Sequence, residues 1–345
     1  MRFASTPSQL KVVRTDSELE CPLIDAGLRA RGLELLALPE MTSEEHLIEA
    51  LENAHLLLTC YARITARVIE SAPFLRGIVK YGVGIDAIDI EAARRREIPV
   101  VNIPEYAEET VAEGAFALMI ALARKLGPLH MEMQARHWAW PTPQWMGADL
   151  AGKTLGLIGV GRIGRSLARM AGAGFRMNVL GYDPFVDQQS MEKVGVQKSK
   201  DLSTLLENSD FVSLHAVLNP QTRHLIGRAE LERMKPTAIL VNVSRGALVD
   251  EAALSEALIS GKIAGAGLDV FSQEPLSTPG HHLQPLFHLP NVIMTPHLTF
   301  YTREAMQRLE EETLLRCDEI LSDSPVQIKS RDPRLRSQTS RVKLV

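Results

Sequence analysis

The sequence predicts an α/β protein made of two doubly wound parallel sheets. Apolar segments of strand length alternate with amphipathic segments of helix length along nearly the whole chain. Apolar strands joined by crossover helices are typical of parallel sheets covered by helices on both faces. The chain has 345 residues, 45% of them hydrophobic, which is enough for the cores of two domains.

Both halves of the chain contain a series of candidate strands. Helical stretches such as SEEHLIEALEN and IEAARRRE separate the strands of the first hundred residues. The expected strands there are KVV, LELLAL, AHLLLT, GIVKY and IPVVN, and those after residue 150 are LGLIG, MNVLGY, FVSLHAV, AILVNV, AGAGLDV and VIMTPH. The pattern therefore predicts one sheet in each half.

Two long helices are expected to join the two sheets. Residues 108–126 are apolar on most of the helix circumference, which predicts burial, whereas residues 302–321 are amphipathic. If the first helix leaves one domain and the second returns to it, the domain between them is an insertion. The predicted boundaries are 104–300 for the inserted domain and 1–103 with 301–345 for the outer domain.

A glycine-rich turn predicts that the inserted domain binds a dinucleotide. The apolar segment 155–158 runs into Gly159, Gly161 and Gly164, spaced G-x-G-x-x-G, and an amphipathic helix follows. The first glycine allows the tight turn, the second lets the backbone approach a pyrophosphate, and the third lets the helix pack on the strand. The helix N-terminus then presents N–H groups and partial positive charge to the phosphates.

Asp183 predicts which dinucleotide is bound. It ends the second strand of this domain, where a carboxylate can accept hydrogen bonds from the adenosine ribose and repels a 2′-phosphate. No Arg or Lys among the next four residues could hold that phosphate. NAD is therefore expected rather than NADP.

Composition excludes several function classes. The net charge of −4 argues against broad binding to nucleic acid or to a membrane surface. The first residues lack the apolar core of a signal peptide, and the three cysteines lie far apart, so we expect a cytoplasmic protein with free thiols. We expect no metal site, because His281, His282 and His288 lie in a Pro-rich loop with no acidic partner.

Two segments stand outside the alternating pattern. All three tryptophans fall in HWAWPTPQW at 137–145, which is either an arm that packs on another subunit or a loop packed on its own domain. The segment from residue 324 onwards is polar and basic, and we expect it to be solvated and partly disordered.

Three polar residues after strands of the inserted domain are candidates for catalysis. Arg245 follows AILVNVS, Glu274 follows GLDVFSQ, and His297 follows VIMTP. Ligands of open parallel sheets bind beyond the carboxyl ends of the strands, so all three can converge on the cofactor. Together they supply an acid or base and a cation for a substrate carboxylate, which hydride transfer to a carbonyl requires.

These segments resemble a known family. VNVSRGALVDEAALSEAL, GLDVFSQEP and TPHLTFYT are similar to the signature segments of the D-isomer-specific 2-hydroxyacid dehydrogenases. KYGVGIDAIDI and NIPEYAEETVAEGAFALMIALAR resemble that family's substrate loop and interdomain helix. YDPF, LNPQTRHLIG and PHLTFYTREAM are similar to the branch around the C-terminal-binding proteins. The resemblance implies a Rossmann NAD-binding domain inserted into a discontinuous flavodoxin-like substrate domain.

The resemblance also implies roles for individual residues. Arg245 would pair with the substrate carboxylate and keto oxygen, and His297 would exchange the proton of that oxygen. Glu274 would orient the imidazole and raise its pKa by stabilising the imidazolium. The residues expected at the cofactor are Gly159, Gly161, Arg162, Ile163, Gly164, Asp183, His215, Ala216, Thr222, Val243, Ser244, Asp269 and Thr110. Those expected at the substrate are Tyr61, Lys80, Val83, Gly84, Arg245, His297 and Tyr301.

Some residues depart from the family pattern or have two interpretations. Phe300 and Tyr301 replace small residues after the histidine, and they either close the pocket over an apolar substrate side chain or pack at the domain hinge. Lys80 either meets a second anionic group of the substrate or is solvated at the end of a strand.

Two functions remain open at this point. The first is NAD-dependent interconversion of 2-ketoacids and D-2-hydroxyacids by a homodimer, as the family implies. The second is an NAD(H)-sensing, corepressor-like binding protein with little turnover, because the C-terminal-binding proteins retain the same three residues.

Overall fold

The computed structural model describes residues 9–276 and 280–345 of the chain. The chain divides into two compact units, each with its own parallel sheet. Unit 1 comprises Met1–Ala107 and Thr302–Val345, and unit 2 comprises Glu108–Tyr301. The predicted fold class, with two doubly wound α/β sheets, is confirmed.

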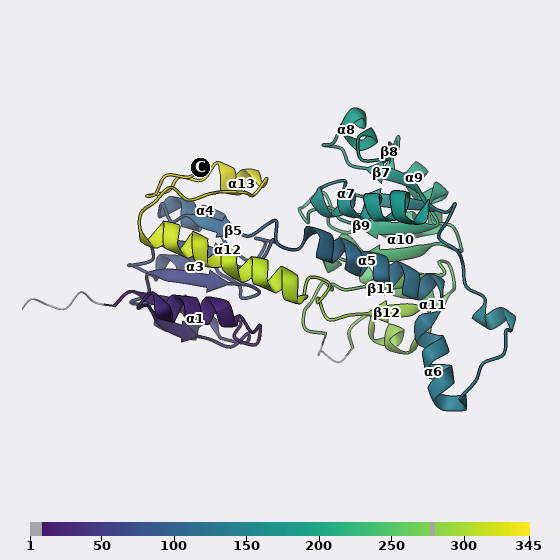
Figure 1. Ribbon diagram of the computed structural model, residues 1–345, viewed down its shortest axis with the longest axis horizontal. Helices are drawn as coiled ribbons and strands as arrows, with labels where there is room; N and C mark the ends of the chain where they lie inside the picture. The colour runs from purple at the N-terminus through teal and green to yellow at the C-terminus, as the bar shows by residue number, and fades with distance from the viewer. Residues whose placement is uncertain (1–8, 277–279) are drawn as a thin grey trace, which may run out of the picture. The chain divides into compact units, whose positions relative to one another are not determined.

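Unit 1 contains a five-stranded sheet in the order β2-β1-β3-β4-β5 (Figure 1). Its strands are β1 (Lys11–Arg14), β2 (Glu34–Ala37), β3 (Leu56–Thr59), β4 (Gly77–Lys80) and β5 (Val100–Asn102). All neighbouring pairs are parallel. The central strands β3 and β4 are buried at every residue, which explains why LLLT and GIVK read as short continuous runs.

Six helices belong to unit 1 in the described part of the chain. They are α1 (Pro22–Ala30), α2 (Glu44–Leu51), α3 (Ala66–Glu70), α4 (Ile90–Arg95), α12 (Arg303–Leu321) and α13 (Pro333–Arg336). The long helix α12 is fixed to the start of α1 by Glu310, whose Oε2 accepts hydrogen bonds from the N–H groups of Leu23 at 2.7 Å and Ile24 at 3.1 Å. The returning C-terminal segment is therefore an integral layer of unit 1.

The basic C-terminal segment is folded, so the expectation of a solvated, partly disordered tail is wrong. Leu335 is fully buried, and Val326 forms a bridge to Leu344. The Gln338 side chain accepts a hydrogen bond from Val100 N at 2.9 Å and donates one to Val100 O at 2.8 Å. The physical reason is that the few apolar residues among the basic ones pack on unit 1, while Gln338 satisfies the backbone of the edge strand β5.

Unit 2 contains a seven-stranded parallel sheet in the order β12-β11-β10-β9-β6-β7-β8. Its strands are β6 (Thr154–Ile158), β7 (Asn178–Tyr182), β8 (Gln197–Lys198), β9 (Phe211–Leu214), β10 (Ile239–Asn242), β11 (Gly265–Leu268) and β12 (Val292–Met294). Six of these coincide with predicted strands, and β8 was not predicted. The order reverses between β6 and β9, which creates the point where open α/β sheets bind ligands.

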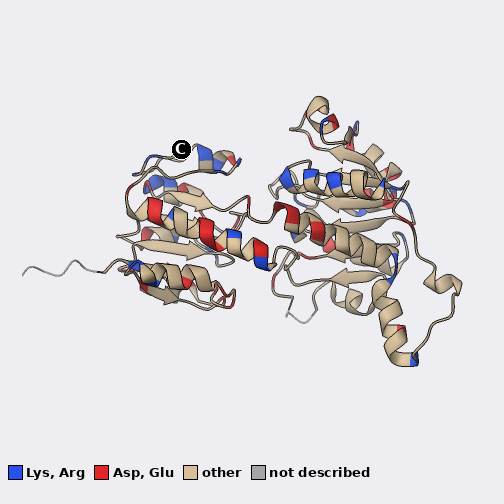
Figure 2. Ribbon diagram, viewed as in Figure 1, with Lys and Arg blue, Asp and Glu red and all other residues tan. Residues whose placement is uncertain are grey.

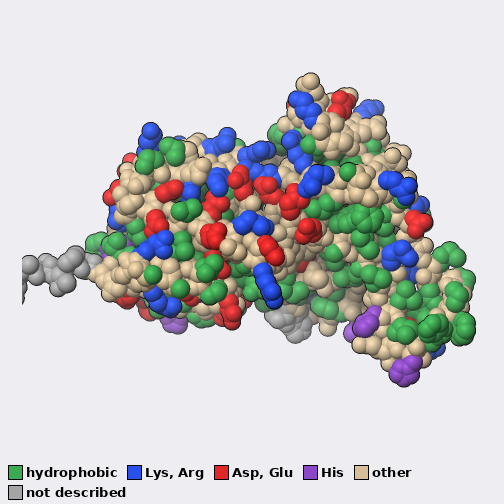
Figure 3. Space-filling model, viewed as in Figure 1, with side chains coloured by type: hydrophobic (Ala, Val, Ile, Leu, Met, Phe, Trp, Pro, Cys, Tyr) green, Lys and Arg blue, Asp and Glu red, His purple; other side chains and the backbone are tan. Residues whose placement is uncertain are grey.

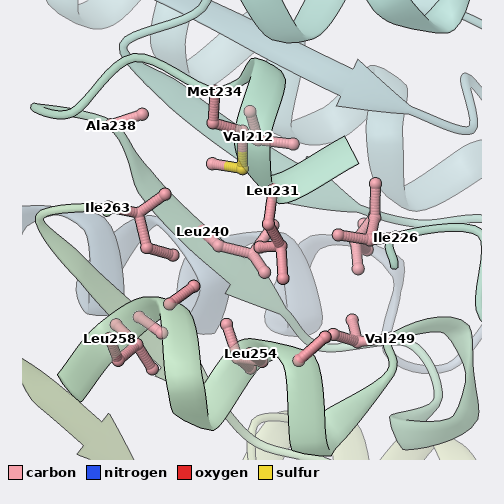
Figure 4. Packing of buried hydrophobic residues seen from close by; sticks show 14 of the residues in the cluster. Val212, Ile226, Leu231, Met234, Ala238, Leu240, Val249, Leu254, Leu258 and Ile263 are labelled. Carbon is pink, nitrogen blue, oxygen red and sulfur yellow. The ribbon is translucent and has the colours of Figure 1, made fainter. Parts of the chain in front are cut away.

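Helices cover the sheet of unit 2 and complete its core. The α-helices are α5 (Glu108–Ala123), α6 (Leu126–Arg136), α7 (Arg162–Arg169), α8 (Gln188–Glu192), α9 (Leu202–Asn208), α10 (Arg228–Arg233) and α11 (Glu251–Ile259). Shorter turns are η1 (Pro143–Trp145), the π-helical η2 (Met170–Gly174), η3 (Gly246–Leu248) and η4 (Gln284–His288). Figure 4 shows Leu240 of β10 packed between residues of α10 and α11, including Leu231 and Leu254.

Helix α6 and the residues after it expose apolar side chains. Trp138 is 60% exposed and Trp140 is 74% exposed, and their rings contact each other edge to face. Figure 3 shows hydrophobic side chains gathered in this region. Trp145 is half-buried, and Lys125 Nζ donates to Gln144 O at 2.7 Å, so the segment contacts its own unit at one end while Trp138 and Trp140 stay exposed.

Neither a membrane-spanning helix nor a metal site is found in the described residues. No helix between residues 9 and 345, apart from the undescribed 277–279, has the length and apolar character to cross a membrane. In the same part of the chain, no group of three or more His, Cys, Asp or Glu could hold a metal ion.

Candidate functional site

The predicted dinucleotide turn lies at the reversal point of the unit 2 sheet. Gly159 has a φ of +94°, and a Cβ there would lie 2.7 Å from Ala216 N. The turn thus packs directly against the end of β9, where His215 N donates to Ile158 O at 2.8 Å. A Cβ at Gly164 would lie 2.4 Å from Gly159 O, so α7 can approach the strand only with glycine at that position.

The turn fits the phosphates of a dinucleotide. No atom of the described residues lies within 4 Å of the position that a Gly161 Cβ would take, so the backbone there is open to a ligand. Gly161 is also the N-cap of α7, and no side chain caps this helix. A helix N-terminus of this kind binds anions through its N–H groups. These observations support a phosphate-binding role for the turn.

Asp183 is held in a fixed orientation beside the glycine turn. Its Oδ2 accepts a hydrogen bond from Val160 N at 3.0 Å, and its Oδ1 accepts one from Phe185 N at 2.9 Å. Each carboxylate oxygen has a second lone pair for a ligand. The acidic end of β7 therefore faces the same turn that the phosphates would occupy.

The ends of β9 and β10 form the other wall of the turn. Ser244 Oγ donates to Ala216 O at 2.7 Å and joins the two strand ends. His215 Nε2 lies 2.9 Å from Ser213 Oγ, whereas the buried Nδ1 has no hydrogen-bond partner in residues 9–276 and 280–345. Burial lowers the pKa of His215 to about 4, so this ring is neutral at pH 7.

The other predicted cofactor residues occupy varied surroundings. The Arg162 guanidinium lies 3.0 Å from the Glu108 carboxylate. This ion pair joins the acidic start of α5 to the basic helix α7 (Figure 2). Thr222 Oγ1 donates to Val217 O at 2.7 Å. Ile163 is half-buried, and Thr110 and Val243 are buried.

Glu274 and His297 are brought together. Glu274 Oε2 lies 2.8 Å from His297 Nδ1, and Glu274 Oε1 accepts a hydrogen bond from Phe271 N at 2.8 Å. Burial raises the pKa of Glu274, but the hydrogen bond and charge of His297, the Phe271 N–H and the charge of Arg245 together lower it below its ordinary value. The carboxylate is therefore ionised at neutral pH and can stabilise an imidazolium.

The loop that carries His297 is fixed by Asp269. This carboxylate is fully buried and accepts four hydrogen bonds: Oδ1 from Thr295 Oγ1 and Leu298 N, and Oδ2 from the N–H and the hydroxyl of Thr299. His297 itself has a φ of +57°, in the left-handed region that few side chains adopt. Asp269 thus stabilises an unusual backbone conformation, which sequence reasoning missed.

Arg245 lies in a turn that is stabilised by hydrogen bonds within residues 242–245. Asn242 Nδ2 donates to Arg245 O at 2.9 Å, and Arg245 Nη1 donates to Ser244 O at 2.7 Å. Gly246 follows it, and a Cβ at Gly246 would lie 1.9 Å from the carbonyl carbon of Phe271. The Arg245 turn therefore packs against the segment that leads to Glu274.

Aromatic residues follow His297. The rings of Phe300 and His297 contact each other edge to face, with centroids 6.3 Å apart, and Phe300 is buried. Tyr301 is 46% exposed and lies with its ring centroid 6.0 Å from that of Phe300. Phe300 thus limits the space beside the imidazole, while Tyr301 remains accessible.

The predicted substrate residues of unit 1 lie where β3 and β4 end. Tyr61 and Val83 are exposed, Gly84 is half-buried, and Lys80 is 7% exposed. Lys80 Nζ donates to Cys60 O and lies 5.7 Å from the centroid of the Tyr61 ring. The interpretation of Lys80 as a solvated residue is therefore wrong, because its ammonium is buried against the loop at Cys60 and Tyr61.

Two polar residues that sequence reasoning missed hold these unit 1 loops. Asp16 Oδ2 accepts hydrogen bonds from Cys60 N at 2.8 Å and Tyr61 N at 3.0 Å. Asn102 Nδ2 donates to Val83 O at 2.6 Å. Asp16 comes shortly after a predicted strand, and Asn102 is the last residue of another, so a polar residue at a strand end could have indicated both.

Residues 116–299 match the family model described as "D-isomer specific 2-hydroxyacid dehydrogenase, NAD binding domain". A D-3-phosphoglycerate dehydrogenase of Methanocaldococcus jannaschii is 42% identical over 77% of this chain and 49% of its own length. A glyoxylate reductase of Korarchaeum cryptofilum is 43% identical over 78% of this chain and 80% of its own length. The crystal structure of D-lactate dehydrogenase from Aquifex aeolicus complexed with NAD and lactic acid has a TM-score of 0.80 and 30% identity, covering 90% of this chain and 95% of that one.

The coverage differs between these relatives. The chain spans about half the length of the phosphoglycerate dehydrogenase, but most of the glyoxylate reductase and of the lactate dehydrogenase. The family model, matched over residues 116–299, includes both the glycine turn and the strand ends that carry Arg245, Glu274 and His297.

Proposed function

The chain belongs to the D-isomer-specific 2-hydroxyacid dehydrogenase family, and from this premise we propose that it interconverts 2-ketoacids and D-2-hydroxyacids with NAD. Unit 2 binds the dinucleotide, and unit 1 contributes the substrate loops. The 2.8 Å contact between Glu274 and His297 is the observation that carries the proposal, because it pairs a carboxylate with an imidazole at the edge of the sheet that carries the glycine turn.

The three strand-end residues divide the chemistry between them. The bound nicotinamide supplies or accepts the hydride. His297 protonates the keto oxygen in reduction and removes that proton in oxidation. Glu274 keeps the ring oriented through Nδ1, which leaves Nε2 for the substrate. Arg245 binds the substrate carboxylate and keto oxygen with its guanidinium fork.

The glycine turn and its neighbours hold the cofactor. Gly159, Gly161 and Gly164 admit the pyrophosphate, and Asp183 accepts the ribose hydroxyls while disfavouring a 2′-phosphate. His215, Ala216, Val243 and Ser244 line the cleft. The remaining cofactor residues in this proposal are Arg162, Ile163, Thr222, Thr110 and Asp269.

The exposed loops of unit 1 bind the rest of the substrate. The backbone N–H groups of Val83 and Gly84 receive the carboxylate, and Asn102 supports this by fixing Val83 O. The further substrate residues in this proposal are Tyr61, Lys80 and Tyr301. The exposed apolar surface of α6, together with Trp138 and Trp140, is the face on which we propose that two chains form a homodimer in the cytoplasm.

Turnover by the purified protein tests the proposed reaction. We expect oxidation of NADH, in preference to NADPH, with glyoxylate, hydroxypyruvate, phenylpyruvate or a methylthio-ketobutyrate. His297→Ala should lower turnover by roughly 10²- to 10⁴-fold, since it removes general acid–base catalysis, and should leave NADH binding nearly intact. His288→Ala, at an exposed histidine, is the matched control.

Two outcomes would contradict this proposal. Equal turnover by His297→Ala and the wild type would exclude His297 as the acid–base group. Tight NADH binding without turnover of any substrate, coupled to NADH-dependent assembly with a protein partner, would favour the corepressor-like alternative.

A further inference from the structure

A second buried carboxylate lies close to the proposed acid–base pair. Glu251 is the first residue of α11 and is 8% exposed. It does not cap its own helix, because Asp250 already accepts hydrogen bonds from Ala252 N and Ala253 N, both at 3.1 Å. A buried carboxylate is costly unless donors satisfy it, so its partners indicate what it does.

The partners of Glu251 are Ser272 and His281, which precede and follow Glu274 in the sequence. Ser272 N donates to Glu251 Oε1 at 2.7 Å, and Ser272 Oγ donates to Oε2. His281 Nε2 lies 3.5 Å from Oε2. Leu283 N donates to His281 Nδ1 at 3.2 Å, so a neutral ring carries its proton on Nε2, facing the carboxylate. The expectation that this histidine lacks an acidic partner is therefore wrong.

The anchored segment is continuous with the acid–base pair. Phe271 N, in the peptide next to Ser272, is the donor to Glu274 Oε1. On its other side the same segment packs against Gly246, where a Cβ would lie 2.2 Å from Ser272 N. The Phe271–Ser272 backbone thus contacts the Arg245 turn and orients Glu274. Glu251 holds this backbone in place through Ser272.

We propose that Glu251 is a positioning residue for this reaction: it fixes the Phe271–Ser272 backbone so that Glu274 stays bonded to His297. The inference rests on the proposed function. It also explains why the residue is a carboxylate, because all three groups that face it are donors. Glutamine would place an NH₂ group against one of these donors, so Glu251→Gln should weaken the anchor with little change in volume.

The first experiment compares Glu251→Gln with Glu256→Gln. Glu256 lies on the same helix, and its ion pair with Arg228 is exposed, which makes it a matched control. We expect Glu251→Gln to lower kcat/KM for the ketoacid by roughly ten- to hundredfold, because small displacements of catalytic groups are costly. NADH binding should be unchanged in both variants. Glu251→Asp, which keeps the charge, should recover part of the loss.

The second measurement follows the ring signals of His297 by NMR at one fixed pH without cofactor, with the signals assigned by their loss in His297→Ala. In Glu251→Gln their chemical shifts should change, because a displaced Glu274 alters the hydrogen bond at Nδ1. In Glu256→Gln they should match the wild type.

The results separate the two proposals. A wild type that turns over no ketoacid overturns the proposed function. An active wild type, with Glu251→Gln equal to Glu256→Gln in kcat/KM and in the chemical shifts of the His297 ring, overturns the positioning role even if Glu251→Gln unfolds more easily. If Glu251→Gln does not fold, Ser272→Ala decides, since it removes one of the same hydrogen bonds and should shift both readouts in the same direction.

Discussion

His215 shows how a single buried ring couples stability to pH. In the folded chain burial lowers its pKa to about 4, whereas in the unfolded chain the pKa returns to the ordinary 6.5. Between these values the unfolded state binds a proton that the folded state does not. Stability is therefore complete above pH 6.5 and is lost as the pH falls toward the folded pKa.

Replacing His215 with asparagine should remove this pH dependence. We expect the free energy of unfolding of the wild type to drop more than that of His215→Asn between pH 6.5 and 4, by about 3 kcal/mol. Urea unfolding at a series of pH values measures the difference, with the exposed His288→Asn as a control. Parallel curves for wild type and His215→Asn would contradict a lowered pKa, because they would mean that folding leaves the protonation of the ring unchanged.

The residues of the site were predictable to different degrees. Arg245, Glu274 and His297 follow apolar strands, and the ends of parallel strands share one edge, so their position could be predicted from order alone. Glu251 and Asp16 could not, because their partners lie far away in sequence: Glu251 binds Ser272, and Asp16 binds the backbone at Cys60. Only the folded chain brings such pairs together.

At the scale of elements, the tight contact between turn η3 and the Phe271–Ser272 segment links two strand ends. Gly246 permits this contact, since any Cβ would meet backbone atoms rather than a movable side chain. The turns after β10 and β11 therefore cannot move independently of each other. This rigidity suits a site in which Arg245 and Glu274 must keep fixed positions relative to the same bound substrate.

Gly246→Ala should break this contact. We expect a loss of stability of about 1–3 kcal/mol from overpacking, together with a loss of turnover, because the backbone of one turn must shift. Gly174→Ala is the matched control, since nothing among the described residues lies within 4 Å of its Cβ position. Thermal unfolding and kcat/KM measure the two effects. An active Gly246→Ala of normal stability would contradict the contact.

Elements with a strong local pattern were predicted well, and those without one were missed. The strands β3, β4 and β10 are apolar up to their last residue, so their sequences alone identify them. Strand β8 consists of Gln197 and Lys198, and it exists only because β7 offers a partner. The C-terminal segment was missed for a similar reason, since Gln338 carries no local signal of its contact with Val100.

At the scale of the whole molecule, the sequence of unit 2 interrupts that of unit 1. Unit 1 is complete only when the segment after residue 301 has folded onto the first hundred residues. Helix α12 binds the start of α1 through Glu310, and Arg31 forms an ion pair with Asp318 at 2.6 Å. The N-terminal sheet therefore depends on residues that are synthesised after the whole of unit 2.

Removing the Gln338 side chain tests the role of the C-terminal segment. We expect Gln338→Ala to self-associate at concentrations where the wild type and Ser337→Ala do not, because two backbone groups of Val100 lose their partners. Light scattering over a concentration series measures this. Identical scattering by all three proteins would mean that other residues of the segment suffice.

An exposed edge strand is a template on which a strand of another molecule can grow. Gln338 occupies both pairing groups of Val100 with a side chain, which ends the ladder, because a single amide cannot be extended by a further strand. The C-terminal segment thus occupies the backbone groups of β5 that a strand from another molecule would otherwise pair with. Since it can reach β5 only after unit 2 has been made, that edge is unprotected during part of synthesis.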